Sequence, residues 1–182
     1  MGRRPFVHER ILEAAFDLFA RRGYEAVSTR EIAAQAKVGH ASMYRHIPSM
    51  ETLGREVYSR ALRPLLEELE LFEATKPKAQ VLIRRFLQML CTWYDTKPRA
   101  LALLIFPPHD FCPEELGEGN PRTPRRVLQR LLRCDADTIA VVWGAMTGPL
   151  QDRYLRRRSG KMAPMAPELA KIVSRLVASI RP

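Results

Sequence analysis

The fold of this chain follows from residues 28–47, which read Ser28-Thr-Arg-Glu-Ile-Ala-Ala-Gln-Ala-Lys-Val-Gly-His-Ala-Ser-Met-Tyr-Arg-His-Ile47. Ser28 or Thr29 can accept the free amide hydrogens of a helical first turn, and Glu31 completes a capping-box pattern with Ser28. The tripeptide Lys37-Val38-Gly39 interrupts this helix. Two short helices joined by a tight turn form a helix-turn-helix.

The second helix of this pair is expected at residues 40–47, because Pro48 disfavours helical geometry at the residue before it. On a helical wheel Met43 and Ile47 share one side, which we expect to face the core. A short helix with small and polar residues on its free side fits the major groove of DNA, which is about 12 Å wide. That free side carries Ala41, Ser42, Tyr44 and Arg45.

The rest of the chain also shows the periodicity of amphipathic helices. Further helices are expected at residues 5–22, 50–72, 79–95, 99–106, 125–132, 135–156 and 167–180. Pro64 is expected to kink the long helix near Arg60, and residues 107–124, rich in proline, are expected to form a loop. The predicted fold class is all-α, with about nine helices. A three-helix helix-turn-helix domain at residues 1–48 precedes a helical domain at residues 49–182.

Residues 28–53, together with Phe19-Ala-Arg-Arg-Gly-Tyr24 before them, resemble the DNA-binding domain of the TetR family of bacterial transcriptional repressors. The resemblance is specific over residues 8–60. Beyond them, only the expected arrangement of helices is similar. It implies that the first domain binds a palindromic operator in double-stranded DNA, and that the second binds a small-molecule effector and forms a homodimer. The chain departs from the usual family pattern at Gly39, His40, Ile47 and Met50.

Ten residues are expected to contact DNA. Arg45 can pair with guanine or a phosphate, and Tyr44 can offer its hydroxyl to a phosphate and its ring edge to a thymine methyl. The free amides at the start of the helix near Thr29 favour a phosphate. The family resemblance adds positions in the turn and in the second helix. The full set is Ser28, Thr29, Arg30, Gly39, His40, Ala41, Ser42, Tyr44, Arg45 and His46.

Aromatic and methionine side chains of the second domain are the candidates for an effector site, although such residues are more often core. The selected set is Phe86, Met89, Trp93, Phe106 and Trp143, and it predicts a small hydrophobic effector. The homodimer is expected to form through residues 135–156 and 167–180. The first of these ranges carries Ala140, Gly144 and Gly148 at four-residue spacing, which permits close approach of another helix within the subunit or from a partner.

Composition limits the class of protein. The 182 residues carry a net charge of +10, which is compatible with DNA, RNA or an anionic membrane as partner. No apolar run reaches the roughly 18 residues of a membrane span, and polar residues after the basic N-terminus indicate that there is no signal peptide. Cys91, Cys112 and Cys134 show no paired spacing, which indicates reduced thiols in a cytoplasmic protein.

No catalytic residue, metal site or cofactor is expected. The four histidines show no metal-binding spacing, and there is no phosphate-binding loop or nucleophile elbow. His109, Asp110 and Cys112 lie close together in sequence but suggest no fourth ligand. Two alternatives to a ligand-responsive repressor stay open, a nucleoid-type DNA binder without an effector and a redox-responsive DNA binder. An enzyme is not expected.

Overall fold

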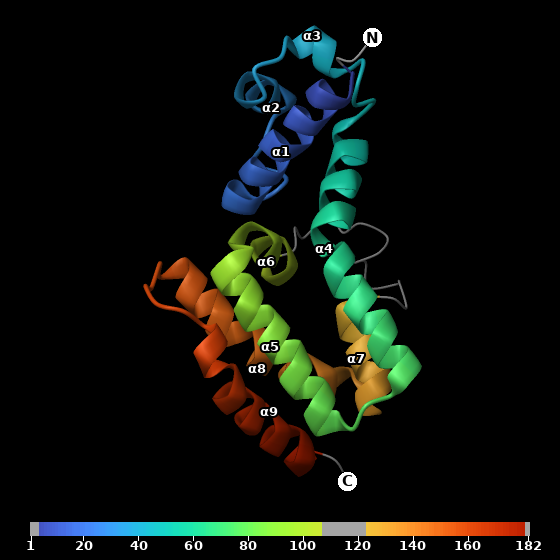
Figure 1. Ribbon diagram of the computed structural model, residues 1–182, viewed down its shortest axis with the longest axis vertical. Helices are drawn as coiled ribbons and strands as arrows, with labels where there is room; N and C mark the ends of the chain where they lie inside the picture. Colours follow the sequence, from blue (N-terminus) through green and yellow to red (C-terminus); the bar gives the residue numbers. More distant parts are fainter. Residues whose placement is uncertain (1–3, 107–122, 181–182) are drawn as a thin grey trace. The chain divides into compact units, whose positions relative to one another are not determined.

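The computed structural model describes residues 4–106 and 123–180, and within these ranges it contains only helices, turns and loops (Figure 1). The predicted all-α class is confirmed. The helices are α1 (Arg4–Arg22), α2 (Thr29–Gln35), α3 (His40–Met43), α4 (Met50–Thr75), α5 (Ala79–Thr96), α6 (Pro98–Ile105), α7 (Pro124–Leu132), α8 (Ala136–Leu155), the short 3-10 helix η1 (Ala163–Met165) and α9 (Ala166–Ile180).

The chain divides into two compact units. The N-terminal unit contains α1, α2, α3, the part of α4 that ends at Arg63, and the end of α6 from Ala102. The C-terminal unit contains α4 from Pro64, α6 up to Leu101, and α5, α7, α8, η1 and α9. The division falls inside α4, which runs through Pro64 as one helix. The boundary expected at residue 48 and the kink expected near Arg60 stay predictions.

In the N-terminal unit, α1 supports α2 through one apolar side. Ile11, Leu12, Ala15 and Phe19 recur at helical spacing, and all four are buried. Gly23 ends the helix in the left-handed region at φ 81°, and its amide donates to the Phe19 carbonyl oxygen at 2.9 Å. The chain then turns back, so that α2 packs on α1 and α3 packs on α2.

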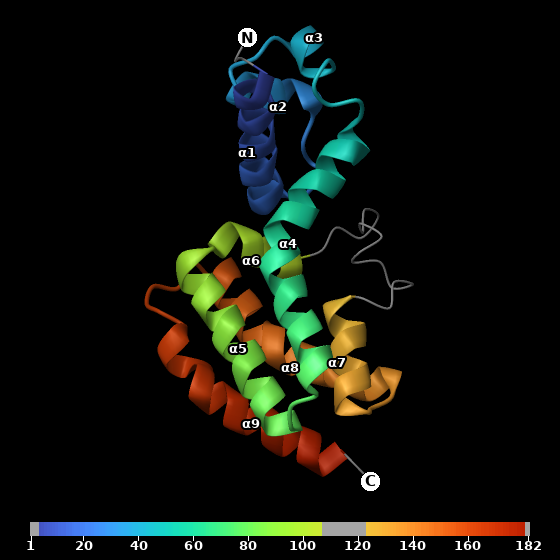
Figure 2. The same cartoon turned by 45° about the vertical axis from the view of Figure 1, so that its right-hand side comes forward.

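In the C-terminal unit, α5 has the central position. Leu82, Ile83, Phe86, Leu87 and Leu90 are all buried, because neighbouring helices cover more than one side of α5. Helix α9 runs alongside α5, and α8 packs against both of them (Figures 1 and 2). Helix α7 packs on α8.

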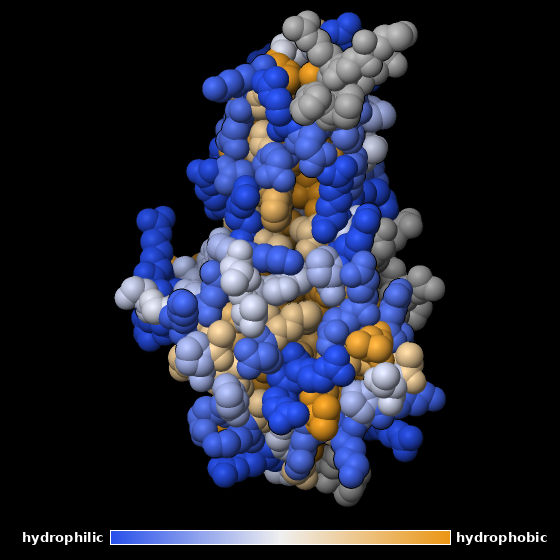
Figure 3. Space-filling model, in the orientation of Figure 1, coloured by the Kyte–Doolittle hydropathy of each residue, from blue (hydrophilic) through white to orange (hydrophobic). Residues whose placement is uncertain are grey.

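Few large apolar side chains are exposed, and the face drawn in Figure 3 is mainly hydrophilic with small apolar patches. None of the described helices combines the length and the apolar character that crossing a membrane requires. The exposed large apolar side chains of the described residues are Tyr44, Leu71, Val141, Leu155, Met165 and Ile172. Tyr44 lies in the helix-turn-helix, and the last four lie on or beside α8 and α9.

Asp95, near the end of α5, holds the connection between α8 and α9. Its two carboxylate oxygens accept hydrogen bonds from the backbone amides of Met162 and Ala163 at 2.7 and 2.9 Å. These amides begin the helical turn η1, where helix geometry supplies no acceptor. The Tyr94 hydroxyl donates to the Arg158 carbonyl oxygen at 3.4 Å, in the same connection. Helix α5 therefore fixes where α9 starts.

Replacing Asp95 with Ala is expected to lower the free energy of unfolding by about 1–3 kcal/mol, because two partly buried amides lose a charged acceptor. Urea denaturation followed by circular dichroism measures the change. Glu70→Ala, which removes an exposed carboxylate from α4, is the control and should leave the free energy nearly unchanged. Equal values for the two variants would show that the Asp95 contacts contribute nothing.

Candidate nucleic-acid interface

The start of α2 is fixed by a capping box, as the sequence predicts. The Ser28 side chain accepts from the Glu31 amide at 3.3 Å, and the Glu31 carboxylate accepts from the Ser28 amide at 2.8 Å. Arg22, in the last turn of α1, donates to Glu31 at 2.6 Å. This hydrogen bond from Arg22, helped by those from Ser28, lowers the pKa of Glu31 from about 4.5 to about 2. The carboxylate therefore joins α1 to the first turn of α2.

The turn between α2 and α3 is held by Arg10, for which the sequence carries no local signal. The Arg10 guanidinium, on α1, donates to the carbonyl oxygens of Ala36 and Lys37, the latter at 2.8 Å. Lys37 has a left-handed backbone with φ 54°, and its side chain is exposed. The turn thus presents a positive charge between the two helices. Lys37 is an additional candidate for DNA contact that the sequence pattern did not single out.

Helix α3 is shorter than predicted. It ends at Met43, and residues 44–46 continue as a hydrogen-bonded turn in which His46 donates to the Met43 carbonyl oxygen at 2.9 Å. Pro48 disfavours helical geometry at Ile47, so the regular helix closes early. Met43 and Ile47 are each only 1% exposed, which confirms that they face the core. Tyr44, Arg45 and His46 consequently lie on the turn.

Three of the predicted DNA contacts form one hydrogen-bonded group across α2 and α3. The Thr29 hydroxyl lies 3.0 Å from Nε2 of His40 and 3.2 Å from the Tyr44 hydroxyl. The rings of His40 and Tyr44 meet edge to face with centroids 5.3 Å apart. The group fixes the direction of both rings on the outer side of the helix-turn-helix. Nearby, Arg45 donates to the Ser42 hydroxyl at 2.9 Å, which holds its guanidinium along the same surface.

None of the ten predicted DNA contacts is buried. Seven are exposed and three are partly exposed, whereas the residues between them at helical spacing (Ile32, Ala33, Met43 and Ile47) are buried. The exposed ones are Ser28, Arg30, Gly39, His40, Ala41, Tyr44 and Arg45, and the partly exposed ones are Thr29, Ser42 and His46. The structure gathers them on a common polar surface, and their contact with DNA stays a prediction.

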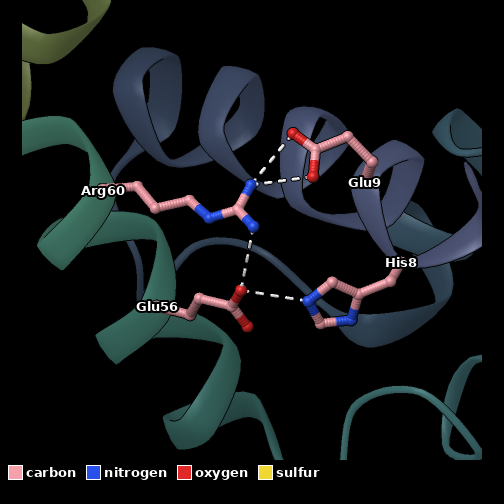
Figure 4. Close-up of polar contacts among 4 residues, drawn as sticks. All are labelled: His8, Glu9, Glu56 and Arg60. Carbon is pink, nitrogen blue, oxygen red and sulfur yellow. Dashed lines mark hydrogen bonds and ion pairs between the residues drawn. The ribbon is translucent and has the colours of Figure 1, made fainter. Parts of the chain in front are cut away.

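A charged cluster connects α1 with the first half of α4 in the N-terminal unit (Figure 4). Nε2 of His8 lies 3.0 Å from Glu56, and Arg60 donates to both oxygens of Glu9 at 2.9 and 2.8 Å. Arg60 also lies 3.4 Å from Glu56, so the four side chains form one chain of contacts. The hydrogen bond with Glu9 raises the pKa of Arg60. Because these side chains are exposed or partly exposed, the cluster contributes little to the stability of the fold.

Residues 11–57 match the model of the bacterial regulatory proteins of the tetR family. The chain is also 51% identical over 43 residues to the HTH-type transcriptional repressor Rv3405c of Mycobacterium tuberculosis. The same identity is found with the HTH-type transcriptional regulator Mb3439c of Mycobacterium bovis. These stretches cover 24% of this chain and 23% of each relative.

The chain is thus similar to the tetR family in this N-terminal segment. The rest of the chain shares the fold of solved regulators at low sequence identity. The transcriptional regulator FadR from Bacillus subtilis, solved in complex with stearoyl-CoA, superposes with a TM-score of 0.71 at 12% identity, over 95% of this chain and 99% of that one. A TetR-like transcriptional regulator from Rhodococcus sp. RHA1 gives 0.64 at 16% identity, over 94% and 93%.

The predicted effector residues lie in different surroundings. Phe86 is fully buried, and its ring lies 6.1 Å from that of Trp143, centroid to centroid. Met89 and Trp93 line a groove of about 550 Å³ between α4 and α5. Phe106 belongs to the N-terminal unit, whereas the other four belong to the C-terminal unit. The structure therefore brings together Phe86 with Trp143 and Met89 with Trp93, and an effector site at these residues stays a prediction.

The cysteines described in the structure offer little to a redox switch. Cys91 is fully buried, and burial raises the pKa of its thiol to about 11, so the reactive thiolate is scarce at neutral pH. Cys134 is partly exposed, and the two cysteines do not form a disulfide with each other. Within residues 4–106 and 123–180, no group of His, Cys, Asp and Glu is arranged to hold a metal ion. His109, Asp110 and Cys112 fall outside the described residues.

Helices α8 and α9 each leave an apolar side partly uncovered. Val141 and Leu155 on α8 are 53% and 69% exposed, and Ile172 on α9 is 54% exposed. A Cβ added at Gly144 or Gly148 of α8 meets nothing within 4 Å, so packing inside the subunit does not require either glycine. A glycine inside a helix costs about 1 kcal/mol relative to Ala. These glycines therefore mark a side of α8 that is open to close approach.

The low pKa of Glu31 can be tested directly. Its carboxyl group should titrate near pH 2, and in the Arg22→Gln variant the midpoint should rise because the largest cause of the shift is gone. Since the folded pKa lies below the ordinary value, the carboxylate stabilises the fold fully above about pH 4.5 and loses this effect as the pH falls towards 2. Carbon-detected NMR of the Glu31 side chain measures both midpoints. A wild-type midpoint near 4.5 would contradict the contact with Arg22.

Proposed function

We propose that this protein is a ligand-responsive transcriptional repressor that binds a palindromic operator as a homodimer and is released by a small hydrophobic effector. The observation that carries the proposal is the exposed polar surface of α2, α3 and the following turn, built over a buried apolar side. Arg30, Arg45 and Lys37 supply positive charge there, while Ser28, Thr29 and Tyr44 supply hydroxyl groups. Such a surface can contact both phosphates and base edges.

Arg45 and Tyr44 are the proposed base-reading residues. Both are exposed, and each is anchored by a partner, Ser42 for Arg45 and Thr29 for Tyr44. A guanidinium held in place can pair with O6 and N7 of guanine, and a fixed phenol can reach a phosphate or a thymine methyl. The start of α2 and the turn at Lys37 take the neighbouring phosphates.

The open sides of α8 and α9 are the proposed dimer interface, within residues 135–156 and 167–180. Two copies of the N-terminal unit would then reach successive major grooves about one helical turn apart, which matches a palindromic operator. The open space at Gly144 and Gly148 supports the partner subunit, and not the same subunit, as the neighbour of this side.

The effector is proposed to bind in the C-terminal unit, at residues drawn from Phe86, Met89, Trp93 and Trp143, whereas the predicted Phe106 belongs to the other unit. A hydrophobic effector is consistent with these side chains, and the FadR protein of Bacillus subtilis, similar in fold, was solved with stearoyl-CoA. Binding would favour one arrangement of α4 over another, and the cluster of His8, Glu56, Arg60 and Glu9 would pass the change to α1. The population of DNA-binding dimers then falls.

The second candidate function is that of a protein that binds DNA without sequence preference and without an effector. The net charge of +10 fits it, because charge alone gives salt-dependent attraction to any duplex. The hydrogen bonds that hold Thr29, His40 and Tyr44 together favour sequence-specific binding, because a protein that binds DNA without sequence preference needs no fixed side chains facing the bases. Buried Cys91 weakens the redox-responsive alternative.

Arg45→Ala and Tyr44→Ala test the reading residues. On the DNA that flanks the protein's own gene, we expect the wild type to leave a footprint on a palindrome, and each variant to lose about 1–3 kcal/mol of binding free energy at particular base pairs. Arg63→Ala removes the same charge from an exposed position on α4 and is the control for Arg45. Equal losses for Arg45→Ala and Arg63→Ala would mean that general charge, and not base reading, supplies the affinity.

Gly144→Leu tests the dimer interface. A Cβ at this exposed position meets nothing within 4 Å in the single chain, so helix content by circular dichroism should be retained, while a partner helix packed against this side would be displaced. Light scattering after gel filtration should show a dimer for the wild type and a monomer for the variant. Ala74→Leu, an equal enlargement at an exposed position on α4, should stay dimeric. A dimeric Gly144→Leu protein would place the interface elsewhere.

A further inference from the structure

A second groove lies between α5 and α9. None of its lining residues is among the predicted DNA or effector contacts, although six of them fall within residues 167–180, the range proposed for dimer contacts. Its volume is about 600 Å³, and all of its lining residues belong to the C-terminal unit. This volume is within the range of about 300–1,000 Å³ that is usual for small-molecule sites. The apolar part of the lining is Val81, Pro167, Ala170 and Ala178, and the polar part is Gln80, Arg84, Lys171, Ser174 and Arg175.

The charge of this groove is unbalanced. Three cationic side chains line it, and no carboxylate is among its lining residues. Lys171 has an exposed partner in Glu168 at 3.1 Å, whereas Arg84 and Arg175 have no ion-pair partner among the residues that the structure describes. By contrast, Arg85 in the neighbouring groove between α4 and α5 is paired with Glu68 at 2.8 Å. An anion in the α5–α9 groove would offset the repulsion between its cations.

We propose that the α5–α9 groove binds a small organic anion that carries a phosphate or carboxylate group and a short apolar part. The guanidinium groups of Arg84 and Arg175 suit the oxygens of such a group, because arginine donates paired hydrogen bonds in a fixed geometry. Ser174 and Gln80 add uncharged donors. The alanines and Val81 offer apolar contact for the rest of the molecule.

The groove lies on a different side of α9 from the proposed dimer interface. At 100° per residue, Pro167, Lys171, Ser174 and Ala178 share one side of the helix, and Met165, Ile172 and Leu176 share the opposite side. Between the two, Ala166, Ala170, Val173 and Val177 are buried. The groove would therefore stay accessible in a dimer formed through the exposed apolar side of α9. The proposal does not depend on DNA binding or on dimer formation.

Calorimetric titration of the full chain with hexyl phosphate tests the proposal. We expect saturable binding of one molecule per chain, and at least about tenfold weaker binding by the Arg84→Gln/Arg175→Gln variant, since both charge-assisted contacts to the anion are lost. Inorganic phosphate should bind more weakly than hexyl phosphate, because it lacks the apolar part. A parallel titration with hexanoate shows whether the groove prefers phosphate or carboxylate.

The control variant is Arg63→Gln/Lys161→Gln, which removes the same two charges at exposed positions outside the groove. It should bind hexyl phosphate as the wild type does, and circular dichroism should show that both variants are folded. Equal weakening in the two variants would overturn the proposal in favour of general charge attraction. If inorganic phosphate binds as tightly as hexyl phosphate, the proposed apolar contact with the ligand is contradicted.

Discussion

The burial of Met43 and Ile47 is the constraint on which the DNA-facing surface depends. Helix α3 has only four residues, too few to be stable by its own hydrogen bonds. It persists because these two side chains fill the core of the N-terminal unit, and because Arg10 holds the carbonyl groups of the preceding turn. Met43 and Ile47 point into the core. Residues at other positions of the same short segment point in other directions, so Ala41, Tyr44 and Arg45 face outward.

The net charge says less about DNA binding by the helix-turn-helix than the composition indicates. Residues 1–48 carry eight basic and five acidic side chains, so most of the excess of +10 lies beyond the helix-turn-helix. Part of that excess lines the α5–α9 groove as Arg84, Lys171 and Arg175. The net charge permits an anionic partner, but the partner is selected by the local arrangement. Hydroxyl and aromatic groups joined by hydrogen bonds lie at α2 and α3, whereas three cations line the groove beside α9.

Much of the fold and part of the site could be predicted because local rules decide them. The Ser28–Glu31 capping box and the burial of Met43 and Ile47 each depend on residues a few positions apart, and the structure confirms both. Other features could not be predicted because they join distant positions. The hold of Arg10 on the turn and the meeting of Thr29 with Tyr44 arise only when helices pack. Helix α3 ends early because Pro48 disfavours helical geometry at Ile47, a residue whose side chain is held in the core.

The central claim is that the outer surface of α2, α3 and the following turn reads a DNA sequence. Selection of bound duplexes from a random-sequence pool, with the wild-type protein at physiological salt, tests this claim most directly. We expect the selected duplexes to converge on two half-sites related by a twofold axis, with centres about one helical turn, or a multiple of it, apart. Retention of duplexes that share no sequence, with affinity set by salt concentration alone, would contradict it.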